Sequence, residues 1–123
     1  MGEIYKYKCE CGYEEKLNLG GGLMSCNLMQ IARFFPKEVE ALKEARQSGE
    51  LENYMMENRL GVCPKCNRLT VVLEFRFKTK SKINKYITNC ETCNGKVEVI
   101  GDEDVSCPKC NKLMMREYAG NWD

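Results

Sequence analysis

The sequence contains no histidine, and this absence excludes several kinds of chemistry at once. Because none of the 123 residues is His, imidazole metal ligands, a His general base and every catalytic triad built on His are ruled out. The phosphate-binding patterns GxGxxG and GxxxxGK[ST] are also absent, and the glycine run at 20–22 is predicted to form a turn. These absences disfavour an enzyme and leave no small-molecule substrate evident.

Long hydrophobic runs are missing as well. No stretch approaches the roughly 18 apolar residues of a membrane-spanning helix, and the beginning of the chain, MGEIYKYKCECG, lacks the apolar segment of a signal peptide. Lys6 stands where a myristoylation signal has Ser or Thr. We therefore expect a cytoplasmic protein that does not associate with membranes.

Cysteine is the residue that the chain has in excess, with nine copies. Eight of them form close pairs, which are Cys9/Cys11, Cys63/Cys66, Cys90/Cys93 and Cys107/Cys110. Cysteines one or two residues apart are poor disulfide partners and good chelating pairs, and in a reducing compartment they are more often ligands. The ninth, Cys26, is expected to be a small buried apolar residue, with an exchangeable fifth ligand or a reactive thiol as the alternatives.

The spacing of the cysteines predicts two four-thiolate sites. The spacing C-x2-C-x13-C-x2-C lets two cysteine turns face each other across a short hairpin, KVEVI out and VS back, which gives a site made of Cys90, Cys93, Cys107 and Cys110. The other site would then contain Cys9, Cys11, Cys63 and Cys66. An alternative pairs Cys63/Cys66 with Cys90/Cys93 and Cys9/Cys11 with Cys107/Cys110. We favour the first arrangement because a loop of helical pattern closes naturally on its own module.

Residues 27–60 are predicted to be a helical insert. Leu28, Ile31 and Phe35 recur at helical spacing after two candidate N-caps, Ser25 and Asn27. A second helix is expected to run from Pro36 to Gly49, and a third, short helix to occupy 50–60. The remaining chain predicts strands at 3–8, 69–78, 85–88, 96–100 and 113–118. The expected division is an N-terminal module at 1–85, which contains the insert, and a C-terminal module at 86–123.

Positive charge is concentrated in the middle of the chain, although 19 basic residues nearly balance 18 acidic ones overall. Residues 60–89 carry a surplus of six positive charges. Five basic residues there are interleaved with Phe75, Phe77 and Tyr86, and they are Arg76, Lys78, Lys80, Lys82 and Lys85. This pattern is typical of a nucleic-acid surface that combines phosphate contacts with base stacking. A solvated strand edge whose lysines discourage aggregation has the same pattern, and we favour that interpretation because the chain as a whole is not basic.

The stretches YKYKCECGYE, CPKCN and CETC…CPKC resemble the zinc ribbon or rubredoxin-like superfamily. The overall plan also resembles small uncharacterised bacterial zinc-ribbon proteins with a helical insert, including the closing GNWD at 120–123. The resemblance implies a small, metal-stabilised α+β fold made of two zinc-ribbon modules, each a β-hairpin knuckle, with a helical insertion in the first. The CEC turn departs from the usual knuckle because it is one residue tighter.

These patterns lead to an expectation for function. Zinc held by four thiolates has no open position for water or substrate, so we expect two structural Zn²⁺ ions per chain and no enzymatic activity. The main hypothesis is a protein-interaction or regulatory module with an unknown protein partner. One alternative is a nucleic-acid-binding protein that uses the basic hairpin at 76–85. A second is a rubredoxin-like electron carrier, because four cysteines also fit a single iron ion.

Overall fold

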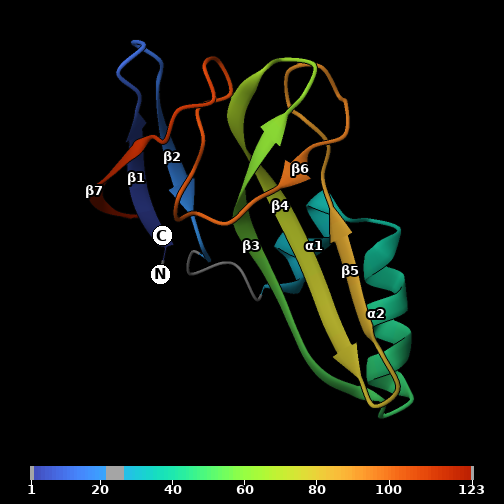
Figure 1. The fold of residues 1–123 in the computed structure, drawn as a ribbon. Coiled ribbons are helices and arrows are strands. Elements are labelled where there is room, and N and C mark those ends of the chain that lie inside the picture. The colour runs from blue at the N-terminus through green and yellow to red at the C-terminus, as the bar shows by residue number, and fades with distance from the viewer. Residues whose placement is uncertain (1, 22–26, 123) are drawn as a thin grey trace.

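A computed structural model describes residues 2–21 and 27–122 of the chain. These residues form two antiparallel sheets and two helices (Figure 1). In chain order the elements are β1 (Gly2–Lys8), β2 (Glu14–Leu19), α1 (Leu28–Phe34), α2 (Glu38–Gln47), β3 (Leu51–Cys63), β4 (Arg68–Thr79), β5 (Ile83–Ile87), β6 (Glu98–Val99) and β7 (Met115–Trp122). Within the described ranges, neither helix has the length and apolar character needed to cross a membrane. The fold is thus a small mixed α/β protein.

The longest element is the β3–β4 hairpin, which forms the centre of the sheet β5-β4-β3-β6. Its strands pair from Leu51 opposite Thr79 to Cys63 opposite Arg68. Alternate side chains point to opposite faces of a strand, so residues such as Leu60 and Leu69 share one face with Phe75. That face is covered along its whole length, and it carries both hydrophobic clusters of the described chain.

Two different layers cover this face of the hairpin. Near the strand ends that carry Cys63, the sheet β2-β1-β7 contributes Tyr7 and Leu17 to a cluster with Leu60 and Leu69. Near the other end, α1 and α2 pack against Phe75 and Phe77, with the helices behind the sheet in the view of Figure 1. Apolar burial of this kind is worth roughly 1.5–3 kcal/mol per large side chain, so the hairpin gains stability from both layers.

The first two predicted helices are confirmed, although α2 begins at Glu38 and not at Pro36. The side chain of Asn27 accepts a hydrogen bond from the backbone N–H of Met29 at 2.8 Å, which satisfies one unpaired donor of the first turn of α1. The helix α2 ends before Gly49, whose φ of +77° is a left-handed conformation that glycine adopts without strain. Ser25, the other candidate cap, lies outside the described residues.

The third predicted helix, at 50–60, is wrong. These residues belong to β3, where Met56 and Leu60 point toward the covered face while Met55 lies 36% exposed on the opposite face. The local sequence is rich in good helix formers, but a continuous antiparallel ladder with β4 overrides that weak preference. Met55 and Met56 therefore point to opposite faces of the sheet.

The hairpin expected between KVEVI and VS is also wrong. The short strand β6 pairs with β3 through Gly61 and Val62, whereas Ser106 forms a bridge with Leu113.

Strand pairing also connects the two expected modules, because β7 pairs with β1 over its length and β5 spans the expected boundary at residue 85. The ends of the described chain therefore meet, with Gly2 opposite Trp122, and the segments 1–85 and 86–123 share sheets with each other.

Glycine at position 2 is required by this closure. The indole N–H of Trp122 donates to the backbone oxygen of Leu19 at 2.9 Å, and the ring crosses the start of β1 on the way. A Cβ atom at Gly2 would lie only 2.2 Å from that indole nitrogen. Only the absence of a side chain lets β7 lie this close.

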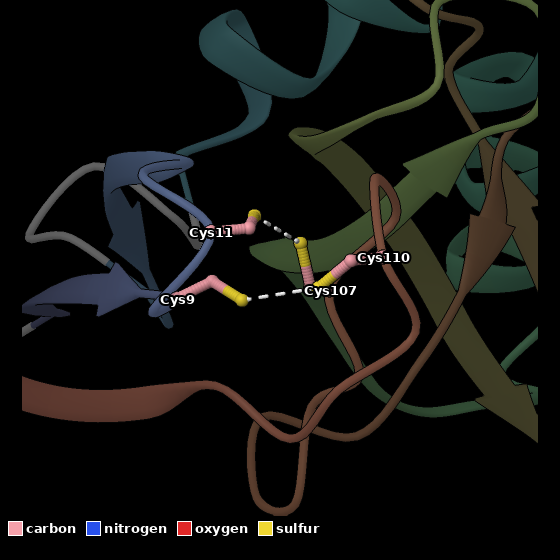
Figure 2. Close-up of side chains that lie close together, drawn as sticks. All are labelled: Cys9, Cys11, Cys107 and Cys110. Carbon is pink, nitrogen blue, oxygen red and sulfur yellow. Dashed lines mark hydrogen bonds between the residues drawn. The ribbon is translucent and has the colours of Figure 1, made fainter.

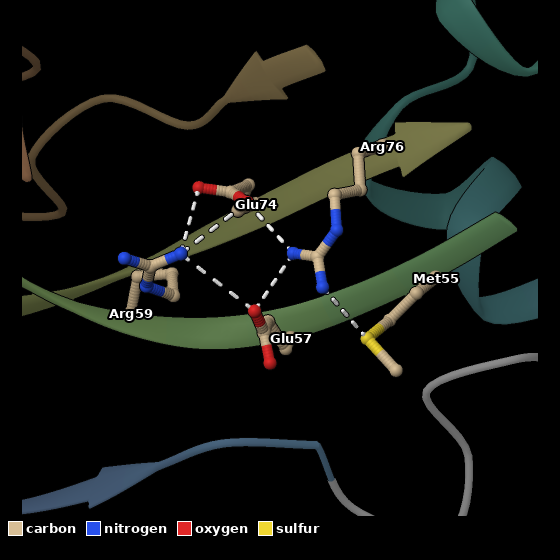
Figure 3. A network of polar contacts seen from close by, with 5 residues as sticks. All are labelled: Met55, Glu57, Arg59, Glu74 and Arg76. Atoms are coloured by element: carbon tan, nitrogen blue, oxygen red, sulfur yellow. Dashed lines mark hydrogen bonds and ion pairs between the residues drawn. The ribbon is translucent and has the colours of Figure 1, made fainter. Parts of the chain in front are cut away.

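The face of the sheet opposite the helices carries a network of charged side chains around Glu74 (Figure 3). Glu74 is only 2% exposed, and Arg76 Nη1 contacts both Glu74 Oε1 at 2.8 Å and Glu57 Oε1 at 2.7 Å. Arg59 Nη1 lies 3.4 Å from Glu74 Oε2. A buried carboxylate needs such partners, because an unpaired buried charge is strongly destabilising.

We expect Glu74→Gln to lower the free energy of unfolding by about 2 kcal/mol, because it removes the charge on which both arginines converge. Urea titration followed by circular dichroism measures this loss. The matched control is Glu52→Gln, which removes the exposed carboxylate that pairs with Lys78 at 3.5 Å and should cost less than about 0.5 kcal/mol. Equal effects of the two substitutions would contradict a structural role for the Glu74 network.

Candidate metal centre

The turn that joins β3 to β4 carries Cys63 and Cys66, and it faces the turn that carries Cys90 and Cys93. The second turn reaches this position because β5 returns along β4 toward the same end of the sheet. Sγ of Cys63 lies 3.5 Å from that of Cys93, and Sγ of Cys66 lies 3.8 Å from that of Cys90. We call these four residues the central tetrad.

The other two cysteine turns come from opposite ends of the chain. The turn between β1 and β2 carries Cys9 and Cys11, and the turn before β7 carries Cys107 and Cys110 (Figure 2). Sγ of Cys9 lies 3.3 Å from that of Cys110, and Sγ of Cys11 lies 3.7 Å from that of Cys107. We call this group the terminal tetrad.

The structure therefore groups all eight paired cysteines, but in the alternative arrangement. The favoured sets, Cys9, Cys11, Cys63 and Cys66 together and Cys90, Cys93, Cys107 and Cys110 together, are wrong. The physical reason is strand pairing: β7 pairs with β1 and β5 pairs with β4, so each ladder brings a late turn beside an early one. The argument from loop closure failed because residues 51–63 form a strand that continues into β4, and not a helix that folds back.

All four turns share one local geometry. The residue after the second cysteine is left-handed in each, with φ of +99° at Gly12, +52° at Asn67, +58° at Asn94 and +66° at Asn111. Each of these residues donates its backbone N–H to the carbonyl oxygen of the first cysteine of its turn, at 2.8–3.0 Å. Glycine and asparagine tolerate this conformation best. Because asparagine tolerates a left-handed backbone, the sequence predicts this conformation for Asn111 after the second ligand of its turn. This prediction is confirmed, and the same conformation is found in the other three turns.

The turns also point backbone N–H groups at sulfur. The N–H of Cys66 donates to Cys63 Sγ, and the N–H of Lys109 donates to Cys107 Sγ, both at 3.4 Å. Such bonds favour the ionised thiolate. The tighter CEC turn closes one residue earlier, since the N–H of Cys9 bonds to the oxygen of Tyr13 where that of Cys107 reaches Lys112.

The sulfur geometry fits a tetrahedral metal ion. A metal–sulfur bond of about 2.3 Å gives a tetrahedron whose edges are roughly 3.8 Å, and the four sulfur–sulfur contacts between facing turns measure 3.3–3.8 Å. Within each tetrad all four sulfur atoms lie within 4.8 Å of one another. Each tetrad could therefore hold one metal ion, which gives two sites in the chain.

Ionisation within the tetrads supports metal binding as well. The backbone N–H groups of Cys93 and Thr92 lower the pKa of the Cys90 thiol to about 6. Burial works against ionisation of Cys107, yet the N–H groups of Lys109 and Cys110 lower its pKa to about 7. One thiol of each tetrad therefore ionises more readily than an ordinary cysteine, and the thiolate is the form that binds a metal ion. The shift is opposite for Cys66, since its contact with the Cys93 thiol raises its pKa to about 12. For Cys9, the lowering by the backbone N–H of Cys11 is outweighed by burial and by the contact with Cys110, which raise the pKa to about 12.

Two tyrosines connect the terminal tetrad to the sheets around it. The hydroxyl of Tyr13 accepts a hydrogen bond from the N–H of Leu69 at 2.8 Å, which links the β1–β2 turn to the start of β4. Lys109 Nζ lies 5.6 Å from the centre of the Tyr13 ring. The hydroxyl of Tyr7 donates to the backbone oxygen of Asp102 at 2.9 Å. Neither tyrosine is predicted by the cysteine spacing, although both stand in the tyrosine-rich stretch around Cys9.

The five basic residues predicted for nucleic acid lie on β4, on β5 and in the turn between them, and they are Arg76, Lys78, Lys80, Lys82 and Lys85. The aromatic residues between them are not available for base stacking on that side. Phe75 and Phe77 are 0% and 3% exposed, and Tyr86 packs against them on the face covered by the helices. Arg76 is held by Glu57 and Glu74. The interleaving in sequence therefore corresponds to two opposite faces.

Cys26, the ninth cysteine, lies outside the residues that the structure describes, so its expected burial is not tested. Comparison of the chain with models of protein families, with curated proteins and with solved structures finds no match.

Removing one ligand from each tetrad tests the grouping. We expect Cys107→Ser and Cys90→Ser each to lose one metal ion per chain, with different regions disturbed. Cys107→Ser should shift the backbone amide signals of β1, β2 and β7, because the terminal tetrad joins these strands to the C-terminal turn. Two-dimensional ¹H–¹⁵N NMR of the variants measures this.

The control is Lys109→Ala, which changes a residue between two ligands and should leave both metal ions bound. The opposite outcome is a Cys107→Ser spectrum in which the signals of 88–96 shift most. That result would restore the grouping in which Cys107 shares a site with Cys90.

Tyr7, which is buried, and Tyr13, which is half-buried, give a pH-dependent prediction. Burial raises the pKa of both Tyr7 and Tyr13 from 10.0 to about 12. Because the folded state holds these phenols neutral, their contribution to stability is present below pH 10 and is lost as the pH rises through 12. Phenolate absorbance in a pH titration should therefore show two tyrosines that ionise only as the chain unfolds, and Tyr7→Phe should remove one of them. Ionisation of all tyrosines near pH 10 without unfolding would contradict the burial.

Proposed function

We propose that the chain is a non-enzymatic zinc protein in which two Zn²⁺ ions act as structural cross-links and hold a protein-interaction module together. The observation that carries this proposal is the pair of cysteine tetrads, each with all sulfur atoms within 4.8 Å. Zinc is the metal proposed because four thiolates in a tetrahedron suit it and no other donor type is present in either tetrad.

The topology explains what a metal would contribute. The terminal tetrad joins residues that are 96 and 101 positions apart in the chain. In the chain-entropy model, a cross-link that closes about 100 residues stabilises a fold by roughly 4–5 kcal/mol. Two separate hydrophobic clusters support this fold, and a module of fewer than about 70 residues around one such cluster rarely stabilises itself without a metal or a cross-link.

Four thiolates would also determine what the metal does not do. A tetrahedral ion with four protein ligands has no position left for water or substrate, so catalysis at either centre is not part of the proposal. The interaction role rests on the surface instead. Several large apolar side chains remain exposed on the described residues, among them Met29 at 81%, Ile83 at 68% and Met115 at 76%.

Metal analysis tests the structural role. Protein purified without added metal or chelator should contain two zinc ions per chain by elemental analysis and native mass spectrometry. Stripping the metal with a strong chelator should abolish cooperative thermal unfolding, because the cross-links are lost, and added Zn²⁺ should restore it.

The double variant Cys9→Ser/Cys63→Ser is the matched control, since it removes one ligand from each tetrad and should not be rescued by Zn²⁺. Iron with visible colour would replace the structural proposal with electron transfer. A chain that unfolds cooperatively without any metal would refute the proposal.

A further inference from the structure

Strand β5 forms an open edge of the larger sheet. It is the outermost strand in the order β5-β4-β3-β6. Thr79 donates its N–H to Lys82, and Thr88 donates its N–H to Leu73, so residues 82, 84, 86 and 88 direct their backbone groups toward β4. Ile83, Lys85 and Ile87 therefore direct theirs outward, where they have no backbone partner among the described residues.

The side chains of these same three residues form a simple pattern on the face of the sheet opposite the helices. Ile83 and Ile87 are 68% and 37% exposed, and Lys85 lies between them, also exposed. Lys85 is opposite Arg76 in the ladder, and Arg76 is already neutralised by Glu57 and Glu74. Lys85 has no ion pair in the part of the chain that the structure describes. The edge thus offers an apolar, a cationic and an apolar position in succession.

The other face of the same edge is hollowed. A groove of about 490 Å³ lies between α2 and β5, and its apolar lining comes from Ala41, Ala45, Phe77 and Tyr86. Glu44 and Lys82 lie at the same groove and have opposite charges. Because successive side chains of a strand point to opposite faces, a strand added to β5 would place every second side chain in this groove.

A second copy of β5 is a poor occupant of this edge. In an antiparallel β5–β5 pair about a twofold axis, Lys85 would stand opposite Lys85 of the second copy, with each Ile83 opposite an Ile87. Like charges directly opposite each other destabilise a strand pair, and lysine on an edge strand is a common device against self-pairing. The same position favours a partner strand with a carboxylate opposite Lys85.

We propose that β5 accepts an extended acidic peptide segment as a fifth strand of the sheet. The segment has apolar residues opposite Ile83 and Ile87, an Asp or Glu opposite Lys85, and small side chains between them that enter the groove beside α2. Main-chain hydrogen bonds then hold the segment and the alternate side chains select it, as in other cases of strand addition. This assignment rests on the proposed interaction role and names its surface and its ligand.

The test uses the full, zinc-loaded chain and a fluorescent peptide of sequence STVAEAVTS, with STVAKAVTS as the mismatched peptide. We expect the Glu peptide to bind, to shift the amide signals of 82–88 and to protect the outward N–H groups of Ile83, Lys85 and Ile87 from exchange. The Lys peptide should bind about tenfold more weakly, since its lysine meets Lys85.

A charge exchange makes the test specific to one residue. The variant Lys85→Glu should reverse the preference, so that the Lys peptide binds better than the Glu peptide by a similar factor. Lys16→Glu is the matched control, because Lys16 is an exposed lysine on β2, which is also an outer strand. It should leave the binding of both peptides unchanged.

Each of several results would overturn the proposal. The first is a Glu peptide that does not bind, and the second is a peptide preference that Lys85→Glu leaves unchanged. The third is a dimer, seen in sedimentation analysis, in which the amides of β5 are protected from exchange without peptide. The fourth is a U-rich RNA oligonucleotide that shifts the same amides more strongly than the peptide. Zinc content is measured on every sample. Failure of the peptide with two zinc ions still bound would therefore reject this surface and leave the structural role of the metal intact.

Discussion

The register of the β3–β4 hairpin is the constraint on which the rest of the structure depends. Twelve residues of β4 face thirteen of β3, and shifting one strand by a single residue would send every side chain to the opposite face. The observed register places Phe75 and Phe77 under the helices and Glu74 and Arg76 on the opposite face. It also holds Cys63 and Cys66 at the turn. Core, charged network and metal ligands are thus fixed by one ladder.

Metal ions bound at the cysteine turns and the strand ladders would support each other. Each cysteine turn is a short local structure, and its two cysteines are held near each other by a left-handed residue and a backbone hydrogen bond. The turn itself does not determine which other cysteine turn it faces. In this fold the strand ladders determine the partner, because β4–β5 pairing and β1–β7 pairing each bring two cysteine turns together. A metal ion bound there would stabilise pairings that the sheets already specify.

The sequence predicted what depends on neighbouring residues and failed on what depends on distant ones. The eight paired cysteines, the Asn27 cap, the end of α2 at Gly49 and the left-handed Asn111 are local features, and each is found in the structure. The helix expected at 50–60 failed because a long-range ladder overrode local preference. The grouping of the cysteines failed for the same reason, since the spacing is equally compatible with both arrangements.

In the basic hairpin at 76–85, the pattern of residues in the sequence differs from the pattern of side chains on the surface. Nucleic-acid binding would require aromatic and basic side chains on the same face. Strict alternation along a strand instead places the two kinds of side chain on opposite faces. Phe75 and Phe77 are accordingly buried under α1 and α2, while Lys85 remains exposed beside Ile83 and Ile87. The positive charge of Lys85 therefore lies at an open strand edge, whereas the neighbouring phenylalanine rings are buried. Recognition through backbone hydrogen bonds, with charge selecting the partner, is the chemistry that such an edge supports.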